Sequence, residues 1–186
     1  AGVGEGEELV VQWPSGIWNP PHKWVGAIYK PGAKGKLPPW EVSYTRFRQG
    51  EHPEAIAMKQ DSGKAIQVNT VIGHLSEALM QGRSLDMSRF AELAPSLTKA
   101  QWDRLDIIAA QLSPPPSDVC LDKDFKQKDF LRPILGDKVD QDFATKTESD
   151  RQDEAVWYER IRLFRLCRCI GFVPTFGPSA KRQRLA

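Results

Sequence analysis

Cysteines and long hydrophobic runs are both scarce in this sequence. Only three of its 186 residues are cysteines. An odd and sparse set argues against a disulfide-stapled secreted domain and indicates a reducing compartment inside the cell: the cytosol, the nucleus or the mitochondrial matrix. No apolar run reaches the ~20 residues that span a bilayer, so we expect no membrane partner. The acidic stretch 4–8 lacks the apolar core of a signal peptide, and a chain that starts with Ala1 is typical of a fragment or a processed form.

An excess of charge of either sign is also missing. The formal net charge is only +2, so no basic field covers the whole chain. A nucleic-acid-binding face would therefore have to come from local clusters of Lys and Arg. Hydrophobic residues make up 40% of the chain, which is enough for a packed core.

The motifs of an enzyme are absent as well. The sequence has no Gly-x-x-x-x-Gly-Lys-Ser/Thr loop, which excludes an ATPase motor of that type. Neighbouring acids such as Asp122 and Asp124 are typical of a solvated surface. Cys167 and Cys169 lack a second cysteine pair at zinc spacing, which favours buried structural thiols over a metal site. We expect no catalytic residue, no metal, no cofactor and no small-molecule substrate.

Four segments differ in composition. Residues 1–40 are rich in Trp, Pro and Lys and predict an extended arm, in which only Trp24 to Tyr29 suits a short strand. Residues 41–112 predict a helical domain, residues 113–150 an acid-leaning connector with one helical turn, and residues 151–186 a C-terminal helix with a basic tail. The predicted fold is mainly α: a small helical bundle with a helix-turn-helix-like core, an extended N-terminal arm and a C-terminal helix.

Apolar spacing and capping residues predict where the helices lie. Thr98 and Gln101 have the spacing of a capping box, and Gly82 follows a helix whose apolar residues recur every three or four positions. The expected helices are Glu41 to Arg48, Pro53 to Gln60, Asn69 or Thr70 to Met80, Met87 to Leu93, Thr98 to Leu112, and Asp153 to Ile170.

An ordered series of residues in the helical domain resembles a known family. The series is Tyr44-Thr45-Arg46-Phe47-Arg48-Gln49-Gly50, Pro53-Glu54-Ala55-Ile56-Ala57, Asn69-Thr70-Val71-Ile72-Gly73-His74-Leu75 and Gly82-Arg83-Ser84-Leu85-Asp86. It resembles the helix-turn-helix domain near the C-terminus of many RecQ-type DNA helicases, over about residues 42–112. The turn from Gln60 to Val68 is longer than the tight turn of that family.

The resemblance implies a recognition helix that begins near Asn69. The N-terminal half of such a helix faces a nucleic-acid groove, which makes His74 a candidate contact unless it forms a hydrogen bond inside the bundle. Lys64, Gln67, Asn69 and Thr70 are candidates for phosphate or base contacts, and capping of the helix is the favoured role of the last two.

Basic residues gather at the two ends of the chain. Lys23, Lys30, Lys34 and Lys36 alternate with Trp residues, which suits binding of unpaired bases or packing of the rings on the protein's own core. Further candidate phosphate contacts lie near the C-terminus: Arg162, Arg165, Arg168, Lys181, Arg182 and Arg184. Lys181, Arg182 and Arg184 also suit a targeting signal or a solvated tail.

The helical domain itself carries balanced charge. Eight basic and eight acidic residues lie between Val42 and Asp106, whereas phosphate neutralisation normally dominates nucleic-acid affinity. We therefore expect a non-catalytic accessory module that binds DNA or RNA without reaction chemistry. Two alternatives stay open: a structural protein of a large ribonucleoprotein, such as a mitochondrial ribosome, and a protein–protein adaptor whose Trp residues fill a partner's pocket.

Overall fold

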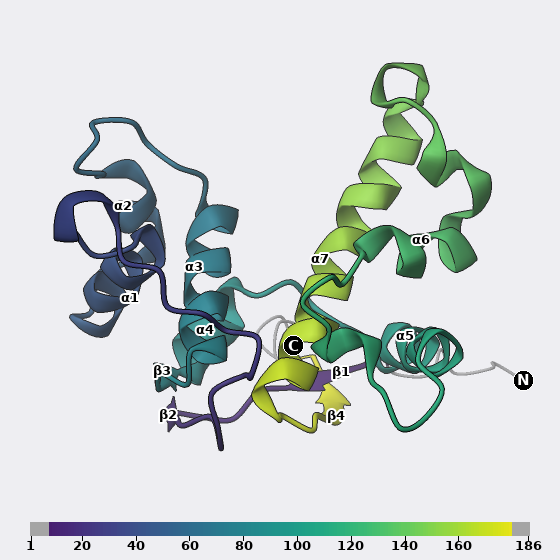
Figure 1. Ribbon diagram of the computed structural model, residues 1–186, viewed down its shortest axis with the longest axis horizontal. Helices are drawn as coiled ribbons and strands as arrows, with labels where there is room; N and C mark the ends of the chain where they lie inside the picture. Colours follow the sequence, from purple (N-terminus) through teal and green to yellow (C-terminus); the bar gives the residue numbers. More distant parts are fainter. Residues whose placement is uncertain (1–7, 180–186) are drawn as a thin grey trace, which may run out of the picture. The chain divides into compact units, whose positions relative to one another are not determined.

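The computed structural model describes residues 8–179, and the prediction of a mainly helical chain is confirmed (Figure 1). Two small antiparallel sheets accompany the helices, one of β1 and β4 and one of β2 and β3. The α-helices are α1 Pro39–Arg48, α2 Pro53–Met58, α3 Val68–Met80, α4 Met87–Leu93, α5 Lys99–Leu112, α6 Gln127–Leu135 and α7 Glu148–Ile170. The strands are β1 Leu9–Gln12, β2 Ile17–Trp18, β3 Leu85–Asp86 and β4 Thr175–Pro178. The short 3-10 helices are η1 Ala33–Gly35, η2 Val119–Leu121, η3 Gly136–Asp140 and η4 Phe143–Thr145.

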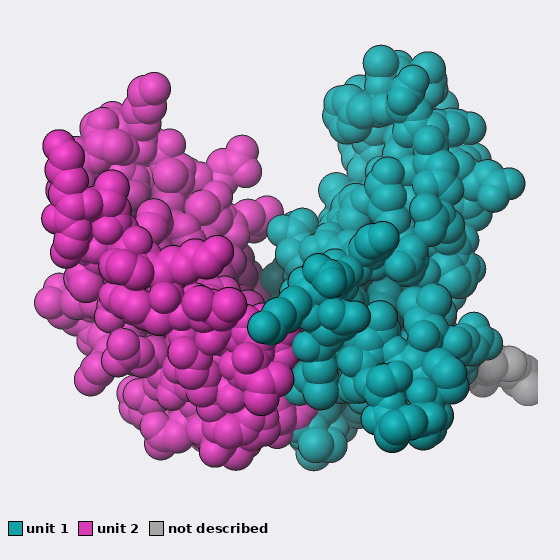
Figure 2. Space-filling view, in the orientation of Figure 1, with its two compact units in different colours: residues 1–12, 95–168, 173–186 teal, residues 13–94, 169–172 magenta. Residues whose placement is uncertain are grey.

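The chain forms two compact units, coloured separately in Figure 2. Unit 2 comprises residues 13–94 and 169–172. The described part of unit 1 comprises residues 8–12, 95–168 and 173–179. These units cut across the four segments expected from composition, because the Trp-rich segment joins the first helices and the acid-leaning segment joins α5.

Helices α1, α2 and α3 pack together in unit 2. The buried stripe of α3 is the expected one: Val71, Leu75, Ala78 and Leu79 are all buried. Phe47 of α1 and Ile56 of α2 complete this core. Each fully buried side chain of this size contributes about 1.5–3 kcal/mol of hydrophobic free energy.

Two helix starts in unit 2 differ from the prediction. Helix α1 begins at Pro39 because proline suits the first turn, where its missing N–H is not needed. Helix α3 begins at Val68, with Gln67 at the N-cap position and no side-chain cap. The prediction that Asn69 or Thr70 caps this helix is therefore wrong. Both residues lie inside its first turn, and both are exposed.

The segment from Trp13 to Trp40 packs on the helices of unit 2. Trp24 and Ala27 are buried with Cys169 and Met80, and the backbone N–H of Trp24 donates to the Met80 carbonyl at 2.9 Å. The N–H of Ala27 donates to the Trp24 carbonyl at 3.0 Å, so the strand expected at 24–29 is wrong and a turn lies there. A short strand does form earlier, where Ile17 pairs with Asp86.

Unit 1 is built around the second half of α7. Ile161 and Phe164 are fully buried, and the ring of Phe164 lies 4.6 Å from that of Trp102 on α5. The capping box at the start of α5 is confirmed, since the side chains of Thr98 and Gln101 each accept from the other residue's backbone N–H. The sheet of β1 and β4 also belongs to this unit.

The acid-leaning segment 113–150 is more ordered than expected. It contains α6 and three 3-10 helices, and α7 begins at Glu148 instead of Asp153. Phe130 and Leu131 anchor α6 in the core of unit 1. The ammonium group of Lys146 lies in the interior, 2.6 Å from a carboxylate oxygen of Glu154 and 3.1 Å from the Val139 carbonyl. The prediction of a connector with one helical turn is wrong, because the charged composition of this segment does not reveal the buried side chains that anchor it.

The Lys146–Glu154 pair leads to a test of the connector's anchoring. The two side chains are 7% and 12% exposed, so Lys146→Met leaves the carboxylate poorly solvated and without its cation. We expect a loss of about 3–5 kcal/mol in the free energy of unfolding, measured with urea. The double variant Lys146→Met/Glu154→Leu should recover most of the loss. A double variant as unstable as the single one would show that packing of Lys146, and not its charge, is what matters.

Candidate nucleic-acid interface

The first two turns of α3 present an open, polar face. Asn69, Thr70 and Gly73 are the exposed positions of this helix, and their spacing of three and four residues places them on one side. Gln67, just before the helix, is exposed too, and the first turn holds no acidic residue. The positive end of the helix macrodipole is therefore uncompensated by a local carboxylate, which favours an anion in front of it.

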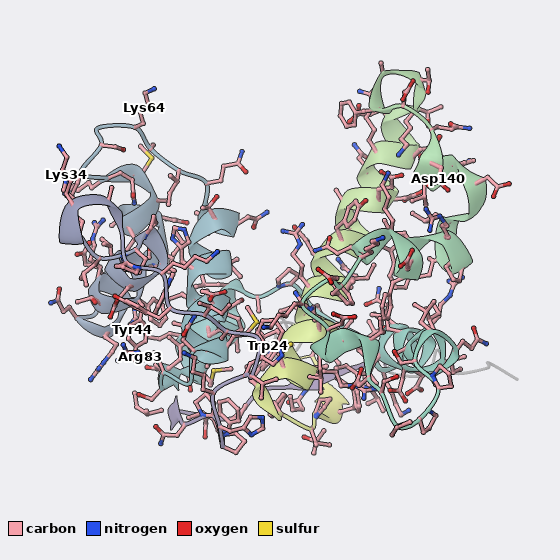
Figure 3. The ribbon with its side chains drawn as sticks, in the orientation of Figure 1. Trp24, Lys34, Tyr44, Lys64, Arg83 and Asp140 are labelled. Atoms are coloured by element: carbon pink, nitrogen blue, oxygen red, sulfur yellow. The ribbon has the colours of Figure 1, made fainter. Side chains whose placement is uncertain are left out.

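Lysines supply most of the accessible positive charge of unit 2. Lys59 and Lys64 lie in the loop between α2 and α3, and Lys23, Lys30, Lys34 and Lys36 lie in the Trp-rich segment; all six are exposed. Within residues 8–179, none of the six is joined to a carboxylate in an ion pair. Figure 3 shows Lys34 and Lys64 projecting away from the ribbon of unit 2.

Three of the four arginines of unit 2 are engaged by other groups of the fold, whereas Arg48 is exposed and forms no ion pair among residues 8–179. Arg46 donates to both carboxylate oxygens of Glu51, at 2.9 and 2.7 Å, and to the Lys59 carbonyl at 2.5 Å. Its hydrogen bonds hold the pKa of the Glu51 carboxyl below its ordinary value. Arg89 donates to the carbonyls of Phe47 and Glu51, at 2.6 and 2.7 Å, above the Phe47 ring. Arg83 pairs with Glu41 at 3.3 Å.

His74 faces the bundle, away from the open side of α3. Its Nδ1 atom lies 2.8 Å from the Ser43 hydroxyl oxygen on α1, and the ring is half-buried. Burial lowers the pKa of this imidazole below 6.5 because the charged form would lose solvation. Of the two roles weighed for His74, the structure supplies the partner needed for the hydrogen bond within the bundle.

The Trp rings of unit 2 pack on the protein itself. Trp24 and Trp40 are buried, and Trp13 stacks on Phe172 with ring centroids 5.3 Å apart. Trp18 meets the same ring edge-on at 5.9 Å. Of the two uses considered for these rings, packing on the protein's own core is the one that the geometry provides.

The arginines of α7 belong to unit 1 and contact the fold in different ways. Arg165 donates to the carbonyls of Cys120 and Asp122, at 3.1 and 2.9 Å. Arg168 forms ion pairs with Asp106 and with Asp118. Arg162 is the exposed member of this set, and its Nε donates to the Tyr158 carbonyl of the same helix at 3.3 Å. Lys181, Arg182 and Arg184 lie outside the described residues.

Sequence reasoning missed two residues of the open face. Lys59 is the first residue after α2 and projects from the same loop as Lys64, but in the sequence it contributes only to the balance of charge. Gly73 belongs to the motif of the helical domain and does not stand out there as a surface position. A helical wheel of α3 would have identified it, because it stands three and four positions after Thr70 and Asn69.

Neither a metal site nor a membrane-spanning element is found in the described part of the chain. Among residues 8–179, no three His, Cys, Asp or Glu side chains gather closely enough to hold a metal ion. No helix of these residues combines the length and the apolar character required to cross a bilayer. Comparisons with protein-family models, with curated proteins and with solved structures found no match to this chain. The case for a function therefore depends on the open face of α3 and the exposed lysines of unit 2.

His74 predicts a pH dependence of stability. Its pKa in the folded chain lies below the unfolded value near 6.5, so the unfolded chain binds the proton more readily. The contribution of neutral His74 to stability is fully present above about pH 6.5 and is lost as the pH falls from there through the pKa of the folded chain. His74→Gln, which does not titrate, should lose less thermal stability between about pH 7 and pH 5 than the unmodified chain.

The melting temperatures of His74→Gln and of the unmodified chain are measured in the same buffers between about pH 7 and pH 5. An NMR titration that gave His74 a pKa above 6.5 in the folded chain would contradict the claim that burial lowers this pKa.

Proposed function

We propose that unit 2 is a non-catalytic module that binds nucleic acid through the N-terminal half of α3 and the loop before it. One observation carries the proposal: Gln67, Asn69 and Thr70 are exposed around a helix N-terminus without acids, and Lys59 and Lys64 precede it. Amide and hydroxyl side chains bind phosphate oxygens or base edges, and lysines neutralise phosphate charge.

The distribution of cations supports contact with the nucleic-acid backbone more than reading of bases. The arginine fork is the side chain best suited to bidentate recognition of guanine, and three of the four arginines of unit 2, Arg46, Arg83 and Arg89, are engaged within the unit. Arg48 is the exposed arginine without an ion pair, and its guanidinium lies 5.9 Å from the centre of the Tyr44 ring. Lysine acts as a point charge that tracks phosphates with little sequence preference. Asn69 and Gln67 are the residues that would add base preference, through adenine.

The resemblance to the helix-turn-helix domain of RecQ-type helicases is consistent with this role. The motif residues that carry it, between Tyr44 and Asp86, lie in unit 2, whereas α5, at the end of the match over about residues 42–112, lies in unit 1. The module would dock or position nucleic acid for chemistry performed elsewhere. Balanced charge in the helical domain makes weak, salt-sensitive binding the expected behaviour.

Charge removal at the loop tests the proposal directly. Short fluorescent duplex DNA, single-stranded DNA and single-stranded RNA are titrated with the chain at several salt concentrations. Lys59→Gln/Lys64→Gln should weaken binding and reduce the slope of log affinity against log salt by roughly one for each phosphate that is no longer neutralised. Because both side chains are exposed, melting temperature should not change.

The matched control removes two exposed lysines of unit 1, Lys123→Gln/Lys128→Gln. This variant should bind as the unmodified chain does. An equal loss of affinity in both double variants would indicate a nonspecific effect of net charge. Failure of the unmodified chain to bind any of the three probes at low salt would overturn the proposal.

A second candidate function, a protein-binding adaptor or a structural part of a ribonucleoprotein, is favoured by exposed apolar side chains. Val25 is 85% exposed at the tip of the turn from Trp24 to Ala27, and Ile28 is 59% exposed beside it. Other exposed apolar side chains of unit 2 are Ile17, Leu37 and Met58. A group of this kind suits burial against a protein surface better than contact with phosphate.

Val25→Ser/Ile28→Ser separates the two candidates. Both residues are exposed, so the variant should keep its melting temperature. Each protein is used as bait in an affinity purification from cell extract, followed by a wash with concentrated salt. A protein partner retained by the unmodified chain should be lost by Val25→Ser/Ile28→Ser and kept by Lys59→Gln/Lys64→Gln. Equal retention by all three proteins would exclude a contact through Val25 and Ile28.

A further inference from the structure

Gly73 has no structural reason to be glycine within the described residues. Glycine is usually required by a positive φ angle or by a close neighbour. Seven glycines of residues 8–179 have a positive φ. At every remaining glycine of this range except Gly73, an added β carbon would lie unusually close to other atoms. At Gly26, for example, it would meet the Trp24 ring. A β carbon at Gly73 has nothing within 4 Å.

Glycine at this position is unfavourable for the fold. Gly73 lies in the middle of α3, where glycine gives up more backbone freedom than alanine and packs no side chain. Alanine would fit the space and favour the helix. The described residues thus give no reason for the missing side chain at this position.

We infer that Gly73 is the point at which a sugar–phosphate backbone makes its closest approach to α3. This inference rests on the function proposed above and names the part of the helix that the ligand covers. Side chains on a helix lean toward its N-terminus, so a side chain at 73 would lie over the turn that carries Asn69 and Thr70. It would stand between these two polar groups and the ligand, whereas glycine leaves them open.

The surroundings of Gly73 favour a nucleic-acid backbone over a helix of a partner protein. Two helices that meet at a glycine in water still require apolar neighbours to bury. Here the neighbouring exposed positions of α3 are Asn69 and Thr70, and the charged side chains of the preceding loop include Lys59 and Lys64. Glu77, one turn after Gly73, is half-buried and accepts a hydrogen bond from Gln81, which places the first carboxylate of α3 beyond the proposed contact.

The test adds side chains of increasing length at this position. Gly73→Ala should raise the melting temperature by about 2–4 °C, because alanine favours the helix, and should weaken nucleic-acid binding about threefold. Gly73→Gln should keep the helix and weaken binding about tenfold or more, since its longer side chain covers Asn69 and Thr70. A purely structural role would move stability and affinity in the same direction, so opposite changes distinguish the two. The probes are the same fluorescent duplex DNA, single-stranded DNA and single-stranded RNA.

The control adds the same side chain to an exposed alanine of another helix. Ala155→Gln on α7 should bind as the unmodified chain does. Unchanged affinity of Gly73→Gln, with binding weakened in Lys59→Gln/Lys64→Gln, would overturn the role of Gly73 and leave the proposed function intact. A lower melting temperature of Gly73→Ala would also overturn it. Absence of binding by the unmodified chain would overturn both.

Discussion

The carbonyl groups at the ends of two short helices set the architecture of unit 2. Helices α1 and α2 have ten and six residues, too few to be stable alone. The last carbonyls of each helix lack partners within that helix. Arg46 reaches the carbonyls of α2 and the residue after it, and Arg89 reaches those at the end of α1. These two guanidinium groups therefore tie α1 to α2 and to α4, and α3 packs against α1 and α2.

This arrangement decides which charges remain on the surface. The guanidinium groups of Arg46 and Arg89 are engaged by backbone carbonyls, so lysines make up most of the accessible cations of unit 2, beside the exposed Arg48 and Arg83. The same packing buries Val71 and Leu75 and turns His74 toward Ser43. What α3 leaves open is a face of Asn69, Thr70 and a glycine. The exposed face thus consists of the residues of α3 that are not used in packing against α1 and α2.

Local patterns predicted the helices well and the contacts between distant residues poorly. The stripe of α3 and the capping box at Thr98 involve residues three or four apart, and the spacing alone identifies both. The hydrogen bond of Arg89 to Phe47 spans 42 residues, and no periodicity reveals it. The same holds for Trp24, whose position in a core depends on Met80 and Cys169. At the candidate site, the sequence identified Lys64 and Thr70 as surface groups but could not show that a hydroxyl on α1 engages His74.

Equal numbers of acidic and basic residues do not imply that charge is spread evenly over the surface, because some charges are paired within the fold and others are exposed. Arg46 and Glu51 neutralise each other, and Asp86 accepts hydrogen bonds from two backbone N–H groups at the start of α4. Near the start of α3 the exposed loop charges include Lys59 and Lys64, with Asp61 between them. A carboxylate in that loop lowers the local field, so a single contact with phosphate is weak. A module of this kind gains useful affinity when a second binding element holds the same strand, since the second event is then intramolecular.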